Sequence, residues 1–288
     1  MDVILAAYTL DKARTALAFC DRLRPGLGAG RRIAVLNDPR LRPGVAHAGW
    51  EFFDGTNSFG EFSAWQEGLD RLGPDRKGGV LFLNDTVVAH RRFSAFRRWS
   101  LLRELGRANP RSVVGFVDHA DNDIGDLRIC GMVLPGWVSS YLFWLGDETL
   151  QRLDHRLWDR AAVDACVRGG ADQATFFSEQ LSPDLREHLC EWLFRGGWYQ
   201  SEPLTAANAD RFARKARVIC AELILSARCW ALGCTRQDPF ERHPLARALD
   251  RRTERLIRTA RLSSALWMQH PQHWERRTRH EAPRVGAG

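Results

Sequence analysis

The chain has 288 residues, of which 44% are hydrophobic and 27% charged, so it is long enough to bury a large core and has the composition of an ordinary globular protein. Its formal net charge is +7, but eleven arginines and five acidic residues lie from Glu241 onward, which puts a surplus of six positive charges in the C-terminal tail. The nearly neutral remainder argues against a nucleic-acid-binding body, because such a body needs a basic surface that releases counterions on binding.

The first third of the chain predicts alternating strands and helices. Apolar runs that stop at polar turns predict the strands, and apolar residues at helical spacing predict the helices. Strand–helix–strand units of this length need a right-handed crossover, which predicts parallel pairing. The predicted strands are Asp2 to Thr9, Arg32 to Leu36 and Trp50 to Phe53, and the predicted helices are Leu10 to Leu23, ended by Pro25-Gly26, and Phe62 to Leu72.

The segment Val80 to Phe93, with the sequence VLFLNDTVVAHRRF, predicts the central strand of the sheet. Four apolar residues stop abruptly at Asn84-Asp85-Thr86, which is the pattern of a strand buried on both faces and ending in a polar turn. The carboxyl ends of central parallel strands are where α/β sheets bind their ligands. Asp85 is therefore the first candidate site residue. The alternative is that these polar residues only stabilise the turn.

A helix around Phe93 to Leu105 and a strand from Val113 to Val117 follow, and this strand again ends in a carboxylate, Asp118. Asp38 and Asp85 stand at the ends of two other predicted strands. A doubly wound sheet would gather these three carboxylates at one edge. Each of them alone is also a typical helix N-cap or turn residue.

The segment after Asp118 predicts a further strand, Ile129 to Leu134, and then an aromatic stretch, Trp137 to Leu153. Aromatic residues at helical spacing form either core or a flat surface for a sugar, and for Trp144 we favour core. The aromatic residues of interest are Trp137, Tyr141 and Trp144, and the candidate acceptor-side polar residues are Ser139 and Ser140.

The last third predicts helices. Ser182 before Pro183 has the pattern of an N-cap followed by proline at the first helical position. Asn208 to Leu232 has an apolar stripe along its length, and its part from Val218 to Leu225 is apolar nearly all round, so this helix should pack on the α/β body. The predicted helices are Asp172 to Leu181, Pro183 to Phe194, Asn208 to Leu232 and the charged Leu245 to Trp267. The predicted domains are residues 1–200 as the catalytic body, 201–268 as a helical extension and 269–288 as a disordered tail.

The seven cysteines are scattered and show no paired metal-ligand spacing, so we expect them to be reduced core residues. The chain begins directly with a strand-like run, and no apolar run reaches the roughly 20 residues of a membrane-spanning helix. These observations predict a cytoplasmic protein. The basic tail could contact the inner face of the membrane as an interfacial helix, or it could be a solvated helix at the domain edge.

Several short motifs together resemble a known family, the rhamnan synthesis F-like group of polysaccharide glycosyltransferases, which have the GT-A fold. Each motif alone is short, and the order and spacing of the set carry the resemblance, which covers approximately residues 1 to 200. The matching residues are Asn57, Phe59-Gly60, Trp65, Gly68-Leu69, Asn84-Asp85-Thr86 within LFLNDTVV, Gly115-Phe116-Val117-Asp118, Ser140-Tyr141-Leu142-Phe143 and Glu179-Gln180-Leu181-Ser182.

The resemblance implies an α/β fold: a GT-A-like (Rossmann-like), mostly parallel sheet flanked by helices, with a C-terminal helical extension. It implies an enzyme of the hexosyltransferase type in a bacterial cell. Such an enzyme moves a sugar from a nucleoside diphosphate-sugar to a hydroxyl of a growing cell-surface polysaccharide or glycan, whose acceptor can be lipid-linked. No nucleic-acid partner is expected.

The roles of the site residues follow from the resemblance and from their places in the predicted sheet. Asp85 is expected to act at the donor diphosphate. Glu179, implied by the resemblance, or Asp118, at a strand end, is expected to take the acceptor proton. The expected substrate-binding residues are Tyr8, Thr9 and Asp38 at the nucleobase and ribose, Asn57, Gly60 and Asn84 in the matched motifs, Arg91 with Arg92 at the leaving diphosphate, and Ser140 on the acceptor side.

One departure from the family bears on the cofactor. The resemblance implies Mg²⁺ or Mn²⁺ between carboxylates and substrate phosphates, with Asp85 as a ligand. Leu83 stands where the family has its first ligand and cannot bind a metal. This departure motivates an alternative, a non-catalytic subunit of a polysaccharide assembly complex. A third hypothesis, nucleic-acid binding through the tail, predicts salt-sensitive binding that truncation near Glu241 removes.

Overall fold

The computed structural model describes residues 1–44, 46–74, 76–90, 93–118, 126–196 and 200–239. The predicted helix Leu245 to Trp267 and the predicted tail lie outside the described residues, as do Arg91 and Arg92. Within the described residues, no helix is both long enough and apolar enough to cross a membrane.

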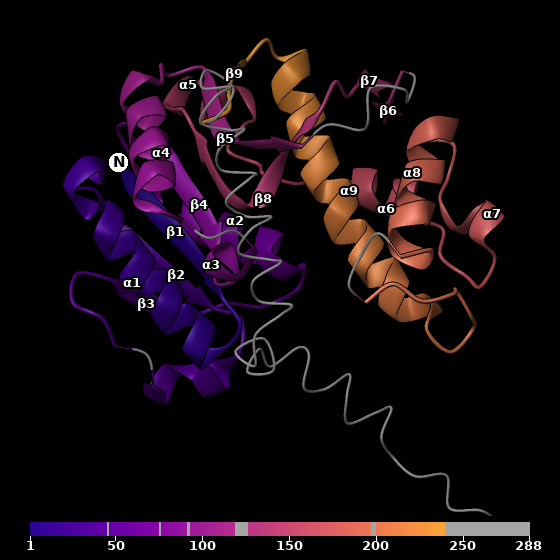
Figure 1. Cartoon of the computed structure of the whole chain (residues 1–288), viewed down its shortest axis with the longest axis horizontal. Coiled ribbons are helices and arrows are strands. Elements are labelled where there is room, and N and C mark those ends of the chain that lie inside the picture. Colours follow the sequence, from indigo (N-terminus) through magenta and orange to yellow (C-terminus); the bar gives the residue numbers. More distant parts are fainter. Residues whose placement is uncertain (45, 75, 91–92, 119–125, 197–199, 240–288) are drawn as a thin grey trace, which may run out of the picture. The chain divides into compact units, whose positions relative to one another are not determined.

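A seven-stranded sheet with the order β3-β2-β1-β4-β8-β5-β9 forms the centre of the described part of the chain (Figure 1). β1 pairs in parallel with β2 and β4, β2 with β3, and β5 with β9, whereas β8 runs antiparallel between β4 and β5. The prediction of a mostly parallel α/β sheet flanked by helices is therefore confirmed. The strands are β1 (Asp2–Ala7), β2 (Arg32–Leu36), β3 (Glu51–Asp54), β4 (Val80–Asn84), β5 (Ser112–Asp118), β8 (Trp137–Leu145) and β9 (Thr235–Gln237).

Helices cover both faces of this sheet. On one face, Phe93 packs between Phe19 of α1, tilted at 4.5 Å, and Phe116 of β5, edge-on at 5.7 Å between ring centroids. On the other face, Trp65 of α2 meets Phe143 of β8 edge-on at 5.2 Å. The helices are α1 (Leu10–Leu27), α2 (Gly60–Leu72), α3 (Val87–His90), α4 (Ala95–Arg107), α5 (Asp147–Arg152), α6 (Arg160–Cys166), α7 (Gln173–Phe176), α8 (Pro183–Phe194) and α9 (Ala209–Ala231), with a 3-10 turn η1 (Pro39–Gly44).

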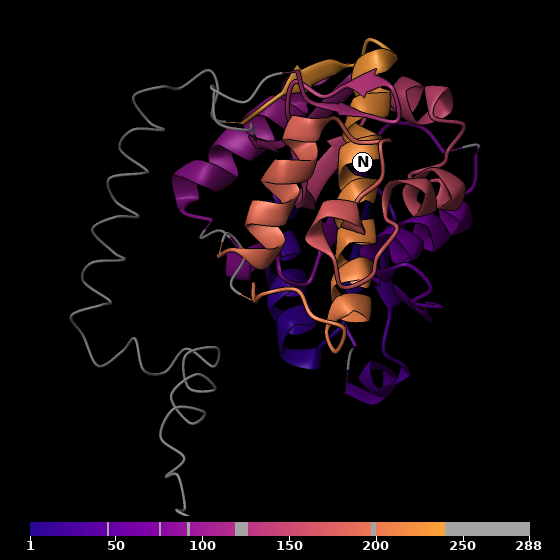
Figure 2. The same ribbon diagram turned by 90° about the vertical axis from the view of Figure 1, so that its right-hand side faces the viewer.

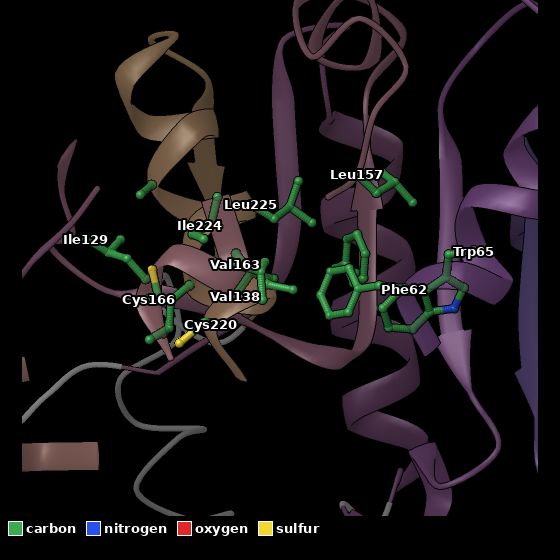
Figure 3. Close-up of a cluster of buried hydrophobic side chains, with 14 of the residues drawn as sticks. Phe62, Trp65, Ile129, Val138, Leu157, Val163, Cys166, Cys220, Ile224 and Leu225 are labelled. Carbon is green, nitrogen blue, oxygen red and sulfur yellow. The ribbon is translucent and has the colours of Figure 1, made fainter. Parts of the chain in front are cut away.

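The longest helix of the described residues, α9, joins the sheet to the smaller helices. It runs beside α8 in both views (Figure 1, Figure 2), and Phe212 of α9 meets Phe194 of α8 edge-on at 5.0 Å. One continuous cluster of buried side chains extends from α2 through β8 and α9 to α6 (Figure 3). α9 thus packs on β8 of the sheet, and Met1–Pro239 forms one compact unit.

The aromatic residues after Gly136 have helical spacing in the sequence, but in the structure Trp137–Leu145 is the strand β8. Its β-branched and aromatic side chains favour a strand. Leu142–Leu145 is buried throughout, so no alternation distinguished this strand from a helix. Trp144 is 5% exposed and pairs with Leu81, which confirms that it belongs to the core.

Three smaller boundaries also differ from prediction. Helix α1 continues through Pro25 to Leu27 and ends at Gly28, which has φ 71°. The predicted strand Ile129 to Leu134 is a hairpin of β6 (Arg128–Ile129) and β7 (Met132–Val133), turned by Cys130 and Gly131 with positive φ. The predicted helix Asp172 to Leu181 shrinks to α7, because Phe177 is already extended and bridges to Val167.

Candidate active site at the carboxyl edge of the sheet

Parallel pairing brings the ends of β1, β2, β4 and β5 to one edge of the sheet, which we call the carboxyl edge. Since β8 is antiparallel, its first residues reach the same edge, where Val117 pairs with Val138 and Asp118 with Trp137. The predicted site residues at this edge, on the strand ends or the turns that follow them, are Tyr8, Thr9, Asp38, Asn84, Asp85, Asp118 and Ser140.

Asp85 fastens the end of β4 to the start of α1. Its Oδ2 accepts hydrogen bonds from the backbone N–H groups of Tyr8, at 2.7 Å, and Thr9, at 2.9 Å. The side chain is only 2% exposed, and its Oδ1 has no hydrogen-bond partner. Burial raises the pKa of Asp85, while the two backbone hydrogen bonds and the charge of Lys12 oppose that rise. The carboxylate thus lies at the N-terminus of α1, where the helix dipole favours negative charge.

Asn84 stabilises the same turn through hydrogen bonds with Thr86. Its Oδ1 accepts hydrogen bonds from the backbone N–H of Thr86 at 3.1 Å and from the Thr86 hydroxyl at 2.7 Å. Asn84 and Asp85 therefore both make turn-stabilising hydrogen bonds, which is the alternative that their sequence pattern left open.

These bonds bear on whether a divalent cation fits. Mg²⁺ takes octahedral oxygen ligands, usually including one or two carboxylates. Here Oδ2 of Asp85 and Oδ1 of Asn84 already accept hydrogen bonds within the turn, and Leu83 offers no donor, so Oδ1 of Asp85 is the one oxygen that these three side chains leave for a cation. The described residues contain no group of three or more His, Cys, Asp or Glu side chains placed to hold a metal ion. The donor set does not fit Mg²⁺ or Mn²⁺, and we derive no step through either.

The ends of β2 and β3 form a second part of the edge. Asp38 pairs with Arg40 of η1, and this side-chain hydrogen bond lowers the pKa of Asp38 to about 2. Asn37 is buried and donates from Nδ2 to the backbone oxygen of Gly60 at 3.1 Å, which ties the end of β2 to the start of α2. Asn57, which is exposed, precedes this contact in a left-handed conformation with φ 49°.

Gly60 brings α9 close to the first strand. Its φ is 56°, and a Cβ there would lie 3.4 Å from Cγ2 of Val218 and 3.6 Å from the Tyr8 hydroxyl. The space beside Tyr8 is thus closed on one side by α9. Burial is the main cause that raises the pKa of Tyr8, and the negative charge of Glu61 adds to it, so the phenol stays neutral.

The third part of the edge lies where β5, β8 and α9 meet. Ser139 donates from its hydroxyl to Asp118, and the backbone N–H of Ser140 donates to Oε2 of Glu222 on α9 at 2.7 Å. Burial raises the pKa of Glu222 to about 7; Asp118 adds to the rise, while the Ser140 hydrogen bonds and Lys215 oppose it. A carboxyl group with this pKa exchanges protons near neutral pH.

Sequence reasoning missed Glu222. The available signal was an acidic residue inside the run ICAELIL from Ile219 to Leu225, which is otherwise apolar or small. Helix periodicity alone did not show which neighbour this side chain meets, because that depends on how α9 crosses β8.

The other predicted base, Glu179, lies elsewhere. It follows α7, its side chain is 72% exposed, and it pairs with Arg168. Its neighbour Gln180 accepts a hydrogen bond from Cys130 in the β6–β7 turn. Figure 1 places α7 and α8 across α9 from the sheet. The structure therefore brings Asp118, and not Glu179, to the carboxyl edge.

Comparisons with known proteins give a limited similarity. No protein-family model and no curated protein matches the chain. Of 24 matching chains of solved structures, one is the galactosyltransferase LgtC in complex with donor and acceptor sugar analogues, with 13% identity over 53% of this chain and 60% of that chain. Another is an active-site mutant of LgtC, with 12% identity over 53% and 59%. Both have a TM-score of 0.30. The proposals below therefore rest on the residues of this chain.

Proposed function

We propose that this protein is a glycosyltransferase that moves a sugar from a nucleoside diphosphate-sugar to a hydroxyl of a growing cell-surface polysaccharide or glycan. The observation that carries the proposal is the gathering of polar side chains from β1, β2, β4, β5 and β8 at one edge of an α/β sheet, where such folds bind their ligands. The motifs that resemble polysaccharide glycosyltransferases supply several of these side chains.

The donor is expected on the β1–β2–β4 side of the edge. Tyr8 and Thr9, with Asp38 across the end of β2, would meet the nucleobase and ribose. The loop that contains Asn57 and Gly60 would lie over them, since a Cβ on Gly60 would be 3.6 Å from the Tyr8 hydroxyl. Exposed Lys12 in the first turn of α1 would supply positive charge for the leaving diphosphate, together with Arg91 outside the described residues.

The acceptor is expected on the β5–β8 side, next to Ser140. Transfer requires a carboxylate that accepts the proton of the attacking hydroxyl while the diphosphate departs from the opposite face of the sugar. Of the two carboxylates named from the sequence, Asp118 lies on this side, whereas Glu179 faces solvent in an ion pair with Arg168.

A second candidate function is a non-catalytic glycosyltransferase-like subunit of a polysaccharide assembly complex. The observation that favours it is the engagement of Asn84 and Asp85 in turn-stabilising hydrogen bonds, which leaves no metal-binding donor set among the described residues. A subunit of this kind need not bind any nucleotide.

Titration calorimetry with UDP, GDP and dTDP distinguishes the two functions. A sharper test adds one variant, Thr9→Glu, which places a negative charge where we expect the diphosphate. The Thr9 side chain makes no capping hydrogen bond, so the substitution should leave the fold intact. We expect at least about tenfold weaker nucleotide binding.

Thr15→Glu is the matched control for this variant, since Thr15 is exposed on the same helix, well past its first turn. It should bind nucleotide as the wild type does. Equal affinities for the two variants would contradict the donor placement, and no binding of any nucleotide by the wild type would favour the non-catalytic subunit.

The location is part of the proposal. We place the protein in the cytoplasm, with the basic tail on the anionic inner face of the membrane, where a lipid-linked acceptor would be found. The surplus of six positive charges from Glu241 onward supports this placement. Liposome co-sedimentation with and without the tail tests it.

A further inference from the structure

Glu222 occupies an unusual position in α9. The ladder between β4 and β8 ends at the pair Leu83 and Leu142, so β4 does not pair with the first residues of β8. α9 supplies acceptors there instead: Ser226 accepts from the backbone N–H of Val138 at 3.0 Å, and Glu222 accepts from that of Ser140 at 2.7 Å.

The two acceptors differ in charge, and this difference indicates that Glu222 has a role besides supporting β8. The neutral hydroxyl of Ser226 satisfies one backbone amide, so a carboxylate is not needed for the same task one helical turn earlier. A charged group costs free energy when it leaves water. Glu222 is partly buried and lies near a second carboxylate, Asp118, whose charge makes ionisation still harder. A carboxylate kept at such a cost is typical of a functional site.

Glu222 is half-buried and not sealed in the core. Together with Ser140 it borders a small void with room for about one water molecule, and the other residues that line this void are mostly apolar. Unlike Asp85, Glu222 keeps part of its surface open to solvent. Glu222 also lies one helical turn after Val218, the residue of α9 that a Cβ on Gly60 at the donor side would approach to 3.4 Å.

We propose that Glu222, and not Asp118, is the general base that takes the proton from the acceptor hydroxyl. This inference rests on the glycosyl transfer proposed above. The O–H bond of the acceptor breaks and its proton moves to the Glu222 carboxylate, while the acceptor oxygen forms a bond to the anomeric carbon. The bond between that carbon and the diphosphate breaks, and the nucleoside diphosphate leaves with the electron pair. A single displacement of this kind inverts the anomeric configuration.

The pH dependence follows from the charges around Glu222. Among the described residues, Lys215 on α9 and Asp118 on β5 are the charged groups that act on it, with Ser140 donating to it from β8. The base works only when it is deprotonated. Because the pKa of Glu222 is raised to about 7, the rate of transfer should rise with pH through about 7 and level off above it.

The test compares the full chain with Glu222→Gln, which keeps the size and the hydrogen bond to Ser140 but cannot take a proton. We expect kcat to fall by about 100-fold or more, with unchanged affinity for the nucleotide that calorimetry identifies and with the pH-dependent rise abolished. Ser226→Ala is the matched control, since it removes the equivalent bond to β8 without removing an ionisable group. It should keep the kcat and the pH profile of the wild type.

The possible failures are distinguishable. If the wild type binds nucleotide and transfers sugar while Glu222→Gln keeps its kcat and pH profile, the base assignment is wrong and the proposed function stands. Retention of the anomeric configuration in the product, determined by NMR, also overturns the assignment. If the wild type neither binds a nucleotide nor transfers sugar, the proposed function fails and the assignment fails with it.

Discussion

Among single residues, Asp85 has a side-chain pKa that its surroundings shift in opposite directions. Two backbone N–H groups and Lys12 favour its charged form, while burial at 2% exposure disfavours it, and burial is the larger effect. The folded-state pKa is therefore raised above the unfolded value of 3.8. An acid of this kind contributes stability at low pH, and that contribution is lost as the pH rises from the unfolded pKa through the folded pKa.

Asp85→Asn tests this sign. Asn keeps one oxygen for the N–H groups of Tyr8 and Thr9 and has no charge to desolvate. As the pH rises above 3.8, its free energy of unfolding should increase relative to that of the wild type, so that the variant becomes relatively more stable, as measured by urea denaturation at several pH values. Asp54→Asn, at an exposed carboxylate paired with Arg42, is the control for the loss of a surface carboxylate. A trend of the opposite sign at Asp85 would mean that the hydrogen bonds outweigh burial.

The sequence predicted where the site residues lie better than what they do. Apolar runs that stop at Asp38, Asp85 and Asp118 suffice to place these residues at one edge, because parallel strands end together. The bonds of Asp85 join residues 77 positions apart, between β4 and the start of α1. No local pattern encodes such a contact. Glu222 was missed for the same reason, since its partner lies on another element.

At the scale of whole elements, β8 completes the acceptor side of the candidate site. Its antiparallel course between β4 and β5 brings Ser140 to the carboxyl edge, and α9 packs across it. The sequence predicted the parallel strands on either side because each follows a clear turn and helix. It did not identify β8, since a strand buried on both faces and rich in aromatic residues has no alternation to read.

The close approach of β8 to β5 depends on a glycine. A Cβ on Gly115 would lie 2.4 Å from Cγ1 of Val138 and 3.2 Å from the backbone oxygen of Leu142, next to the irregularity in the pairing of the two strands. Gly115→Ala should lower the free energy of unfolding by about 2 kcal/mol, because overpacking forces the strands apart. Chemical denaturation measures this loss.

Gly106→Ala is the matched control for Gly115→Ala. Gly106 lies in α4 with no atom near its absent Cβ, so alanine there should stabilise the helix by up to about 1 kcal/mol. Equal effects at the two glycines would show that β8 does not depend on the close contact at Gly115.

For the whole molecule, the candidate site and the excess charge belong to different parts of the chain. The described residues of the site lie within Met1–Pro239, one compact unit whose core is continuous from the sheet to α9 and α6. Six of the seven surplus positive charges lie from Glu241 onward.

A chain that ends at Pro239 should therefore separate two properties. In about 0.15 M salt, the nucleotide that stabilises the full chain should raise the melting temperature of the truncated chain by a similar amount, because ligand stabilisation depends on the affinity of the folded body. Pelleting with anionic liposomes should be lost, because it depends on basic residues beyond Glu241. Equal pelleting of both chains would dismiss the membrane contact of the tail. Loss of the nucleotide effect in a truncated chain that still melts cooperatively would mean that residues after Pro239 complete the donor site.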